Sequence, residues 1–259
     1  GSEWSYTNWN VNEPNNAGGD QNSVRMYSSQ HQGMWDDLRG SYEYPFVCQI
    51  KMTDNGILMV GGYTNQTTKT SGLYVPSTGK YCDLPPLPAQ RTFHSVTGLT
   101  ACGGSEDVGK TCVTFSIANG QWETSYNLTT PLWGHVAWKT SKGILLMGGR
   151  EGSSSTSKTT LLLPGGGIQD GPFRLSRKTF RSCAVEDTRN GSVIITGGFN
   201  GRQSINSVDR YNEQGHVEAL PNLNHAKHGH ACSGYYNEEG NLVGKTNNNS
   251  YCYLCLFRP

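Results

Sequence analysis

An apolar run that ends in two glycines occurs four times in this chain, and this repeat constrains the fold more than any other feature. The four copies span residues 57–62, 99–104, 144–149 and 193–198. Their first glycines are Gly61, Gly103, Gly148 and Gly197, so successive steps measure 42, 45 and 49 residues. A period of this length is typical of proteins built from repeated supersecondary units.

Each repeat also contains a second strand signal, a turn and a late landmark residue. The second strands are predicted at 72–75, 112–115, 159–162 and 207–211, and the dipeptide Asn119-Gly120 is typical of a hairpin turn. The landmarks lie 31 or 32 residues beyond the second glycine and begin a short strand: His94, His135, Arg181 and His230. Each unit therefore holds about four strands, which is the size of a β-propeller blade.

The glycine pairs have a conformational explanation. Two residues without a Cβ atom permit positive φ angles and a close approach of the backbone to its neighbours. No Gly-Lys-Ser/Thr sequence follows any of the four pairs. We therefore expect the pairs to be structural and not to cradle a phosphate.

These landmarks together resemble the kelch repeat, over residues 51–235. The first unit has Gly61-Gly62, then Tyr74, Leu84-Pro85, Arg91 and His94-Ser95 in the order of that family. The resemblance implies a mostly β fold with a kelch-type β-propeller of four recognisable blades, and we expect the propeller to be incomplete. The alternative is a four-bladed ring in which residues 230–232 supply the missing inner strand of the first blade. Residues 236–259 break the repeat pattern and are predicted to be an irregular tail.

Oxygen-bearing side chains crowd the first fifty residues, which lack helical periodicity. Glu13, Asn15, Asp20, Asp36 and Asp37 offer the carboxylate and amide oxygens that Ca²⁺ prefers. A cis peptide bond at Pro14 would turn the side chains of Glu13 and Asn15 to the same side. These oxygen donors and the turn at Pro14 predict a calcium-binding loop.

The order Trp9, Glu13-Pro14-Asn15, Trp35-Asp36-Asp37 and Phe46-Val47-Cys48 resembles the C-terminal half of a C-type lectin domain. The resemblance implies that residues 1–50 are such a half domain. It also implies that Glu13, Asn15, Asp36 and Asp37 bind one Ca²⁺ and, through it, mannose-type sugars. Gln21 occupies the position where the family has a further carboxylate ligand, and the adjacent Asp20 is the expected substitute.

Cysteines and glycosylation signals favour an extracellular setting. The chain has eight cysteines, and Cys102 and Cys112 bracket a diglycine turn, so we expect them to form a disulfide. Cys183 and Cys232 occupy the same place in successive units, which leaves open whether they are buried thiols or pair elsewhere. Four Asn-x-Ser/Thr sites are present, at Asn65, Asn127, Asn190 and Asn248.

Composition narrows the range of partners. The 21 basic and 20 acidic residues give a formal net charge of +1, so no electrostatic argument favours nucleic acid. No apolar run reaches the roughly 20 residues of a membrane-spanning helix. The abrupt end of the repeat pattern after Val243 leads us to expect that the chain is a fragment.

The sequence thus predicts an extracellular recognition protein and no catalytic centre. The lectin segment would bind mannose-type glycans or glycoproteins through Ca²⁺, and the propeller would present loops to a protein partner. The alternative is an adhesion or matrix protein whose lectin segment is inert and whose propeller alone binds. A propeller oxidase is a more distant third reading, because no ligand set for its metal is recognisable.

Overall fold

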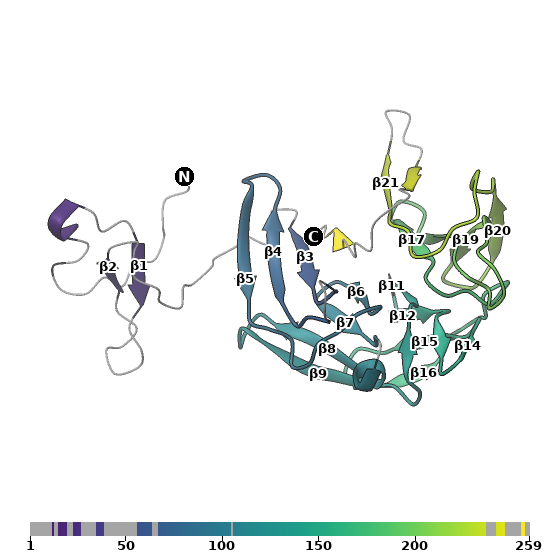
Figure 1. Cartoon of the computed structure of the whole chain (residues 1–259), viewed down its shortest axis with the longest axis horizontal. Coiled ribbons are helices and arrows are strands. Elements are labelled where there is room, and N and C mark those ends of the chain that lie inside the picture. Colours follow the sequence, from purple (N-terminus) through teal and green to yellow (C-terminus); the bar gives the residue numbers. More distant parts are fainter. Residues whose placement is uncertain are drawn as a thin grey trace. The chain divides into compact units, whose positions relative to one another are not determined.

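The computed structural model describes residues 12, 15–19, 23–26, 35–38, 56–63, 67–104, 106–236, 242–246 and 255–256. Internal contacts divide the chain into two units, residues 1–51 and residues 52–259 (Figure 1). In the described residues of both units, strands predominate and the helices are single short turns. No described helix has the length and the apolar character to cross a bilayer.

The first unit contains a short 3-10 turn and one hairpin. The turn is η1 (Ala17–Gly19), and the hairpin pairs β1 (Ser23–Met26) with β2 (Trp35–Leu38) in antiparallel register. The register sets Val24 opposite Asp37 and Arg25 opposite Asp36.

The second unit is a series of antiparallel sheets, four of them with four strands, as the repeat predicts. Sheet I has the order β23-β3-β4-β5 and sheet II the order β6-β7-β8-β9. Their strands are β23 (Cys255–Leu256), β3 (Ile57–Val60), β4 (Ser71–Val75), β5 (Lys80–Leu84), β6 (Ser95–Thr97), β7 (Thr100–Cys102), β8 (Thr111–Ser116) and β9 (Gln121–Asn127). The 3-10 turn η3 (Glu106–Lys110) connects β7 to β8.

Sheets III and IV follow with the orders β11-β12-β15-β16 and β17-β18-β19-β20, and a two-stranded sheet V is formed by β21 and β22. Their strands are β11 (Val136–Thr140), β12 (Gly143–Met147), β15 (Thr159–Leu162), β16 (Ile168–Asp170), β17 (Cys183–Asp187), β18 (Ser192–Thr196), β19 (Val208–Asn212), β20 (Val217–Leu220), β21 (Cys232–Tyr236) and β22 (Leu242–Thr246). A small three-stranded sheet has the order β10-β13-β14. Its strands are β10 (Leu132–Trp133), β13 (Arg150–Glu151) and β14 (Ser154–Ser155).

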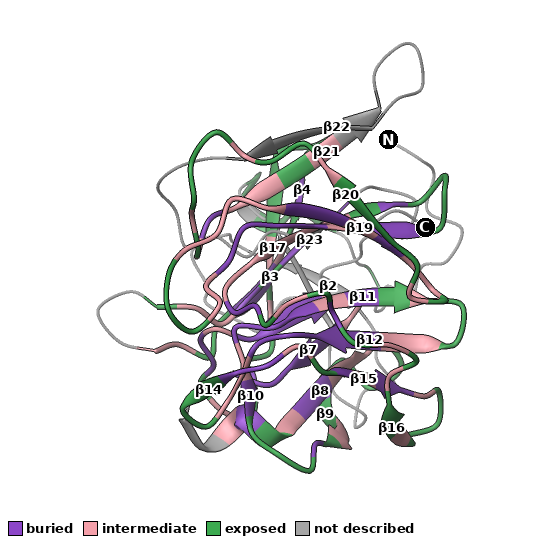
Figure 2. Ribbon diagram, turned by 90° about the vertical axis from the view of Figure 1, so that its right-hand side faces the viewer, coloured by how far each residue is buried: buried purple, intermediate pink, exposed green. Residues whose placement is uncertain are grey.

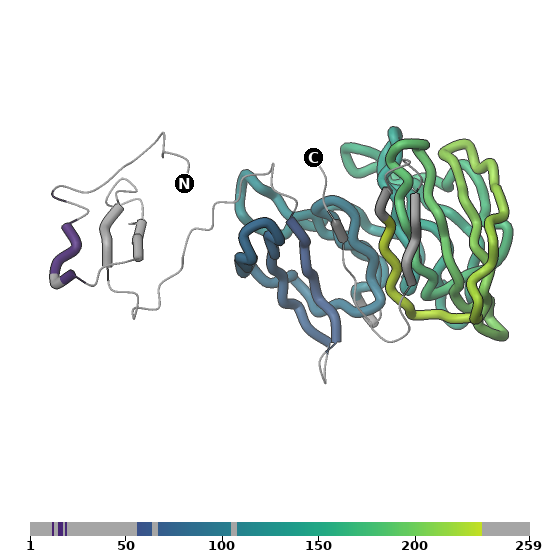
Figure 3. Tube along the Cα trace, turned by 90° about the horizontal axis from the view of Figure 1, so that it is seen from above, coloured from purple at the N-terminus to yellow at the C-terminus, as the bar shows by residue number. Residues whose placement is uncertain are grey.

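Successive sheets lie side by side, and their first strands contact one another. β6 contacts β11, β11 contacts β17, and β17 contacts β21. The sheets follow in chain order in Figure 1, and the colour gradient shows the same order from above in Figure 3. The second unit is therefore an array in which each sheet is packed against its sequence neighbours.

The hydrophobic core is divided among the spaces between neighbouring sheets. One cluster joins sheets I and II and includes Leu58, Val113 and Trp122. A second joins sheets II and III, and a third, which includes Trp138 and Tyr211, joins sheets III and IV. Figure 2 shows the buried residues concentrated on inner strands such as β7 and β19, whereas β16 and β20 are mainly exposed.

The four glycine pairs adopt the conformation that the sequence predicts. All eight glycines have positive φ, between 55° and 123°. The N–H of each second glycine donates to a carbonyl about thirty residues ahead: Gly62 to Arg91 at 2.8 Å, Gly104 to Leu132 at 3.0 Å, Gly149 to Thr179 at 2.7 Å and Gly198 to Lys227 at 2.8 Å. Each pair thus anchors the segment that leads into the next sheet.

The end of the repeat differs from the four-bladed alternative. The strand beside β3 is β23, with Cys255 opposite Leu58, and not residues 230–232. Cys232 instead begins β21, whose partner is β22. Two described strands, β22 and β23, lie within residues 236–259.

Candidate functional site

The predicted lectin site is described in part. The side chain of Asn15 is exposed, and its Oδ1 accepts a hydrogen bond of 2.8 Å from the N–H of Ala17 at the start of η1. Asp36 and Asp37 lie in the middle of β2. Glu13, Asp20 and Gln21 lie outside the described residues.

The donor chemistry of this set fits calcium, because Asn15, Asp36 and Asp37 supply amide and carboxylate oxygens. Within the described ranges no three His, Cys, Asp or Glu side chains lie close enough to hold a metal. The calcium site therefore remains a prediction, with Asn15 and Glu13 as the ligands expected from the loop and Asp36 and Asp37 as those expected from β2.

Two of the four glycosylation signals are described, and both are exposed. Asn127 ends β9, and Asn190 lies in the turn between β17 and β18. The Nδ2 of Asn190 donates to the buried carboxylate of Asp187 at 2.9 Å. Asn65 and Asn248 lie outside the described residues.

The landmark histidines lie buried where one sheet meets the next. His135 Nε2 is 2.6 Å from Ser95 Oγ, and His230 Nε2 is 2.8 Å from Thr196 Oγ1. The ring of each landmark histidine also lies against the first glycine of a pair. A Cβ atom on Gly61 would be 3.0 Å from His94 Cε1, and one on Gly103 would be 2.8 Å from His135 Cε1. We call His94, His135 and His230 the junction histidines.

Burial keeps the junction histidines neutral. It lowers the pKa of His94 to about 4 and that of His135 to about 3, below the ordinary value of 6.5, and nearby positive charge adds to the effect at His94. Burial also lowers the pKa of His230 to about 4, and the positive charges of Lys227 and His228 contribute to this shift. These rings therefore pack and accept or donate hydrogen bonds, and they do not carry charge at neutral pH.

The third landmark was placed one residue too early. A Cβ on Gly149 would be 2.7 Å from His135 Cβ, and the corresponding contact of Gly198 is 3.1 Å to the Cβ of Ser182. Ser182, and not Arg181, is therefore the structural equivalent of the junction histidines. The third unit has one more residue than the first between its glycine pair and this position, which shifted the count.

Arg181 belongs to a different series, in which backbone hydrogen bonds cross from sheet to sheet. Gly134 N–H donates to Phe93 O, Arg181 N–H to Gly134 O, and Gly229 N–H to Arg181 O, each at 2.7 Å. All four residues have positive φ, of 57°, 61°, 53° and 64° in chain order. We call this series, Phe93–Gly134–Arg181–Gly229, the junction ladder.

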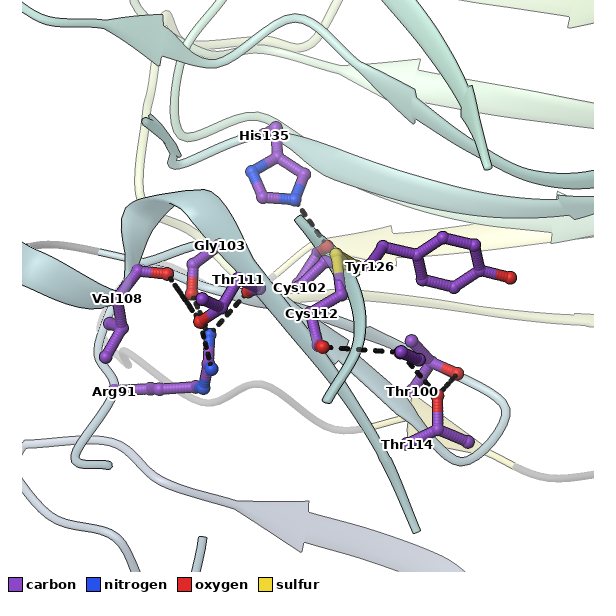
Figure 4. Close-up of a disulfide and its surroundings, with 12 residues drawn as sticks. Arg91, Thr100, Cys102, Gly103, Val108, Thr111, Cys112, Thr114, Tyr126 and His135 are labelled. Carbon is purple, nitrogen blue, oxygen red and sulfur yellow. Dashed lines mark hydrogen bonds between the residues drawn. A yellow bond between two sulfur atoms is a disulfide. The ribbon is translucent and has the colours of Figure 1, made fainter. Parts of the chain in front are cut away.

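A buried arginine joins sheets I and II (Figure 4). Arg91 Nη1 donates to the carbonyls of Gly103 and Thr111, both at 2.8 Å, and Nη2 donates to Thr111 Oγ1 at 2.6 Å. Burial lowers the pKa of Arg91 to about 10, so the guanidinium stays charged at neutral pH. Its hydrogen bonds satisfy carbonyl groups at the turn that carries the second glycine pair.

Two described disulfides reinforce the array. Cys102 and Cys112, the pair expected from the sequence, are joined across β7 and β8, where they are register partners. Cys183 and Cys232, whose pairing was left open, are joined to each other and connect the first strands of sheets IV and V. The sequence signal for this pairing was that both cysteines occupy the same place in successive units, because equivalent positions of neighbouring sheets are adjacent. Cys82 is also disulfide-bonded.

Sequence reasoning missed a group of aromatic rings and arginines that three consecutive sheet junctions bring together. Its members are Phe93, Trp133, Arg150, Phe180 and Arg181, and we call it the aromatic–arginine cluster. The Phe180 ring packs edge-on to Trp133 with centroids 4.7 Å apart, and Phe93 lies 5.7 Å from Trp133.

Both arginines of the cluster lie over ring faces. The Arg181 guanidinium carbon is 4.0 Å from the Phe93 centroid and 5.1 Å from that of Phe180. Arg150 lies 5.4 Å from the Trp133 centroid and 5.6 Å from that of Phe180. Phe93 and Arg181 sit directly before landmark positions, which is the only sequence signal that could have indicated the cluster.

No family model matches the chain. The structure is similar to a solved structure described as "Structure of YjhT", with a TM-score of 0.54 and 10% sequence identity. The match covers 70% of this chain and 69% of the other. At this identity the likeness concerns the fold alone, and it agrees with a mostly β architecture of successive antiparallel sheets.

Proposed function

We propose that this chain belongs to an extracellular recognition protein, in which a kelch-type β-propeller is the scaffold for a protein partner and a partial C-type lectin domain binds mannose-type glycans through Ca²⁺. Two described disulfides and two exposed glycosylation signals support the extracellular setting.

The junction ladder is the observation that carries the scaffold proposal. The same backbone position of four successive units lies in one hydrogen-bonded series, so equivalent residues of different sheets gather on one side of the array. Neighbouring first strands contact each other in the same order. These contacts support our proposal that the sheets are blades of a propeller, a fold that would present loops from several repeats to one ligand.

The lectin proposal rests on the donor set and its order along the chain. Asn15 lies in a turn, and Asp36 and Asp37 follow in the second strand of a hairpin, so the described residues combine loop and strand donors. Bound Ca²⁺ would supply a Lewis-acid centre for two neighbouring sugar hydroxyls. The protein residues would orient the ion and accept hydrogen bonds from the same hydroxyls.

A glycan array probed with the full chain tests the sugar proposal. We expect binding to mannose-type glycans that is lost when calcium is chelated, and lost in the Glu13→Ala and Asp37→Ala variants. Asp170→Ala is the matched control, because Asp170 is an exposed carboxylate of sheet III in the other unit of the chain. Binding that is insensitive to chelator would sink the sugar proposal.

The second candidate is an adhesion or matrix protein with an inert lectin segment. The observation that favours it is Gln21, which stands where a carboxylate ligand is expected. In that case a labelled full chain would bind cell surfaces equally well with chelator and after Glu13→Ala. Restoration of calcium-dependent glycan binding by Gln21→Asp would instead show that one missing carboxylate limits the site.

A further inference from the structure

The aromatic–arginine cluster is assembled from residues far apart in the sequence. Phe93 comes from the junction of sheets I and II, and Trp133 from the next junction. Trp133 is paired in register with Arg150, and Phe180 and Arg181 come from the junction of sheets III and IV. Phe93 and Arg181 are ladder residues, and Trp133 and Phe180 directly precede ladder residues, so the cluster lies on the side of the array where the ladder runs.

Two ladder positions keep side chains where glycine would be easier to accommodate. Gly134 and Gly229 satisfy the positive φ without strain, whereas Phe93 and Arg181 adopt φ of 57° and 53° with a Cβ present. These two strained residues are the ones that form the 4.0 Å cation–π contact. Strain that persists at one side-chain pair points to a role for that pair.

The intervening glycine allows the contact. A Cβ on Gly134 would be 2.4 Å from the Phe180 ring and 3.3 Å from Arg181 Cγ. Any side chain at this position would displace Phe180 or the stem of Arg181. The absence of one lets Arg181 reach over the ladder to Phe93.

The guanidinium of Arg181 has unused hydrogen-bonding capacity. Among the described residues its side chain forms no hydrogen bond or ion pair, and its Nε is buried without a partner. The guanidinium lies over the Phe93 ring, and its two Nη groups donate to no described residue, so they remain for a ligand. Arg150 uses Nε and Nη2 for the carbonyl of Ser153, so its Nη1 stays available near Phe180.

The chemistry of this edge selects the ligand. A guanidinium fork binds a carboxylate through two parallel hydrogen bonds, and nearby rings lower the local dielectric and strengthen them. Trp133 is only half-buried and offers an apolar surface next to Arg150. Tryptophan and arginine together are typical of the residues that contribute most at protein–protein interfaces.

We propose that the aromatic–arginine cluster binds an acidic peptide segment of a partner protein. One Asp or Glu carboxylate binds the fork of Arg181, a second interacts with Arg150, and an apolar side chain between them packs on Trp133. The net charge of +1 provides no general attraction for acids, so recognition depends on these two arginines. This inference rests on the proposed scaffold function and names the chemistry of its partner.

Fluorescence anisotropy with a labelled octapeptide of four Glu, one Leu and three Ser tests the proposal, with chelator present to silence any lectin binding. We expect saturable binding that a Gln-for-Glu peptide does not compete. Arg181→Gln should weaken binding at least tenfold, and Arg181→Lys should weaken it as well, because an ammonium lacks the fork. Arg202→Gln, at an exposed arginine outside the cluster, should stay within twofold of the unmodified protein.

Arg181→Gly separates recognition from folding. Glycine suits the positive φ of this ladder position, so the variant should keep its melting temperature and lose peptide binding. Equal peptide affinity in Arg181→Gly and the unmodified chain would overturn the proposal. So would binding of an acidic oligosaccharide, but not the peptide, through Arg181. The sugar proposal would survive either result, because the glycan array depends on Glu13 and Asp37. The scaffold proposal would survive as well, because it rests on the backbone hydrogen bonds of the junction ladder.

Discussion

At the scale of single residues, close backbone approach at the glycine pairs governs the junctions between sheets. Gly103 has φ of 65°, and a Cβ there would lie 2.2 Å from the carbonyl oxygen of Leu132. Gly120 has nearly the same φ, 64°, but nothing lies within 4 Å of its Cβ position. Comparing substitutions at Gly103 and Gly120 therefore separates the cost of a positive φ from the cost of a steric clash at the Cβ atom.

We predict that Gly103→Ala lowers the free energy of unfolding by at least about 3 kcal/mol, because left-handed strain and overpacking act together. Gly120→Ala should cost only the strain, about 1–2 kcal/mol. Urea denaturation of both variants measures the difference. Equal losses would contradict the close approach at the junction.

Stability should also depend on pH through the junction histidines. The pKa of His135 is about 3 in the folded protein and 6.5 in the unfolded chain, so between these values the unfolded chain binds more protons. Stability is complete above about pH 6.5 and is lost as the pH falls toward 3. His135 alone should contribute a loss approaching 1.4 kcal/mol per pH unit in this window.

The His135→Gln variant tests this dependence, because glutamine can still bond Ser95 without titrating. Urea denaturation between pH 7 and pH 4.5 should show that the free energy of unfolding falls less steeply with pH in the variant. The difference in slope should correspond to about one proton fewer taken up on unfolding. His216→Gln is the control substitution, since His216 is an exposed histidine between β19 and β20. If the free energy of unfolding depends on pH equally in His135→Gln and in the unmodified protein, the His135 ring is not buried in its neutral form.

At the scale of elements, the regular strands were predictable and the exceptions were not. The period and the glycine pairs predicted β3, β7, β12 and β18 and the strands that follow them, because alternation and turns are local properties. Ser182 was missed because one extra residue in the third unit moved an arginine into the counted position. β23 was missed because two residues near the end of the chain pair with β3 through a contact that no local pattern records.

The candidate binding residues divide in the same way. Asn15, Asp36 and Asp37 follow from motif order, whereas Phe93, Trp133 and Arg181 become neighbours only when three junctions are assembled. Cation–π contacts between separate repeats leave no spacing signal in the sequence. The cluster could therefore be identified only from the structure.

The disulfide between Cys183 and Cys232 should stabilise the connection of sheets IV and V. It closes a sequence separation of 49 residues, for which the chain-entropy estimate is about 4 kcal/mol. Replacing both cysteines by serine should lower the free energy of unfolding by an amount of that order, measured by urea denaturation without reductant. A thiol assay should confirm that the other disulfides remain closed. A loss under about 1 kcal/mol would contradict a stabilising role for this link.

At the scale of the whole array, stability depends on neighbours. A two-stranded sheet such as β21–β22 is marginal alone, and repeated units gain their stability from the interfaces between them. Here the interfaces combine three core clusters, the buried Arg91 and the junction ladder. A recognition surface built from several junctions requires that these interfaces hold the sheets as one cooperative body.

Native-state hydrogen exchange of the ladder amides tests this requirement most directly. Gly134, Arg181 and Gly229 each donate an N–H to the preceding junction, so each amide can exchange only when two neighbouring sheets separate. We predict that all three exchange with one common free energy, equal to that of global unfolding. Exchange at three distinct and lower free energies would show that the sheets open independently, and would contradict a shared recognition surface.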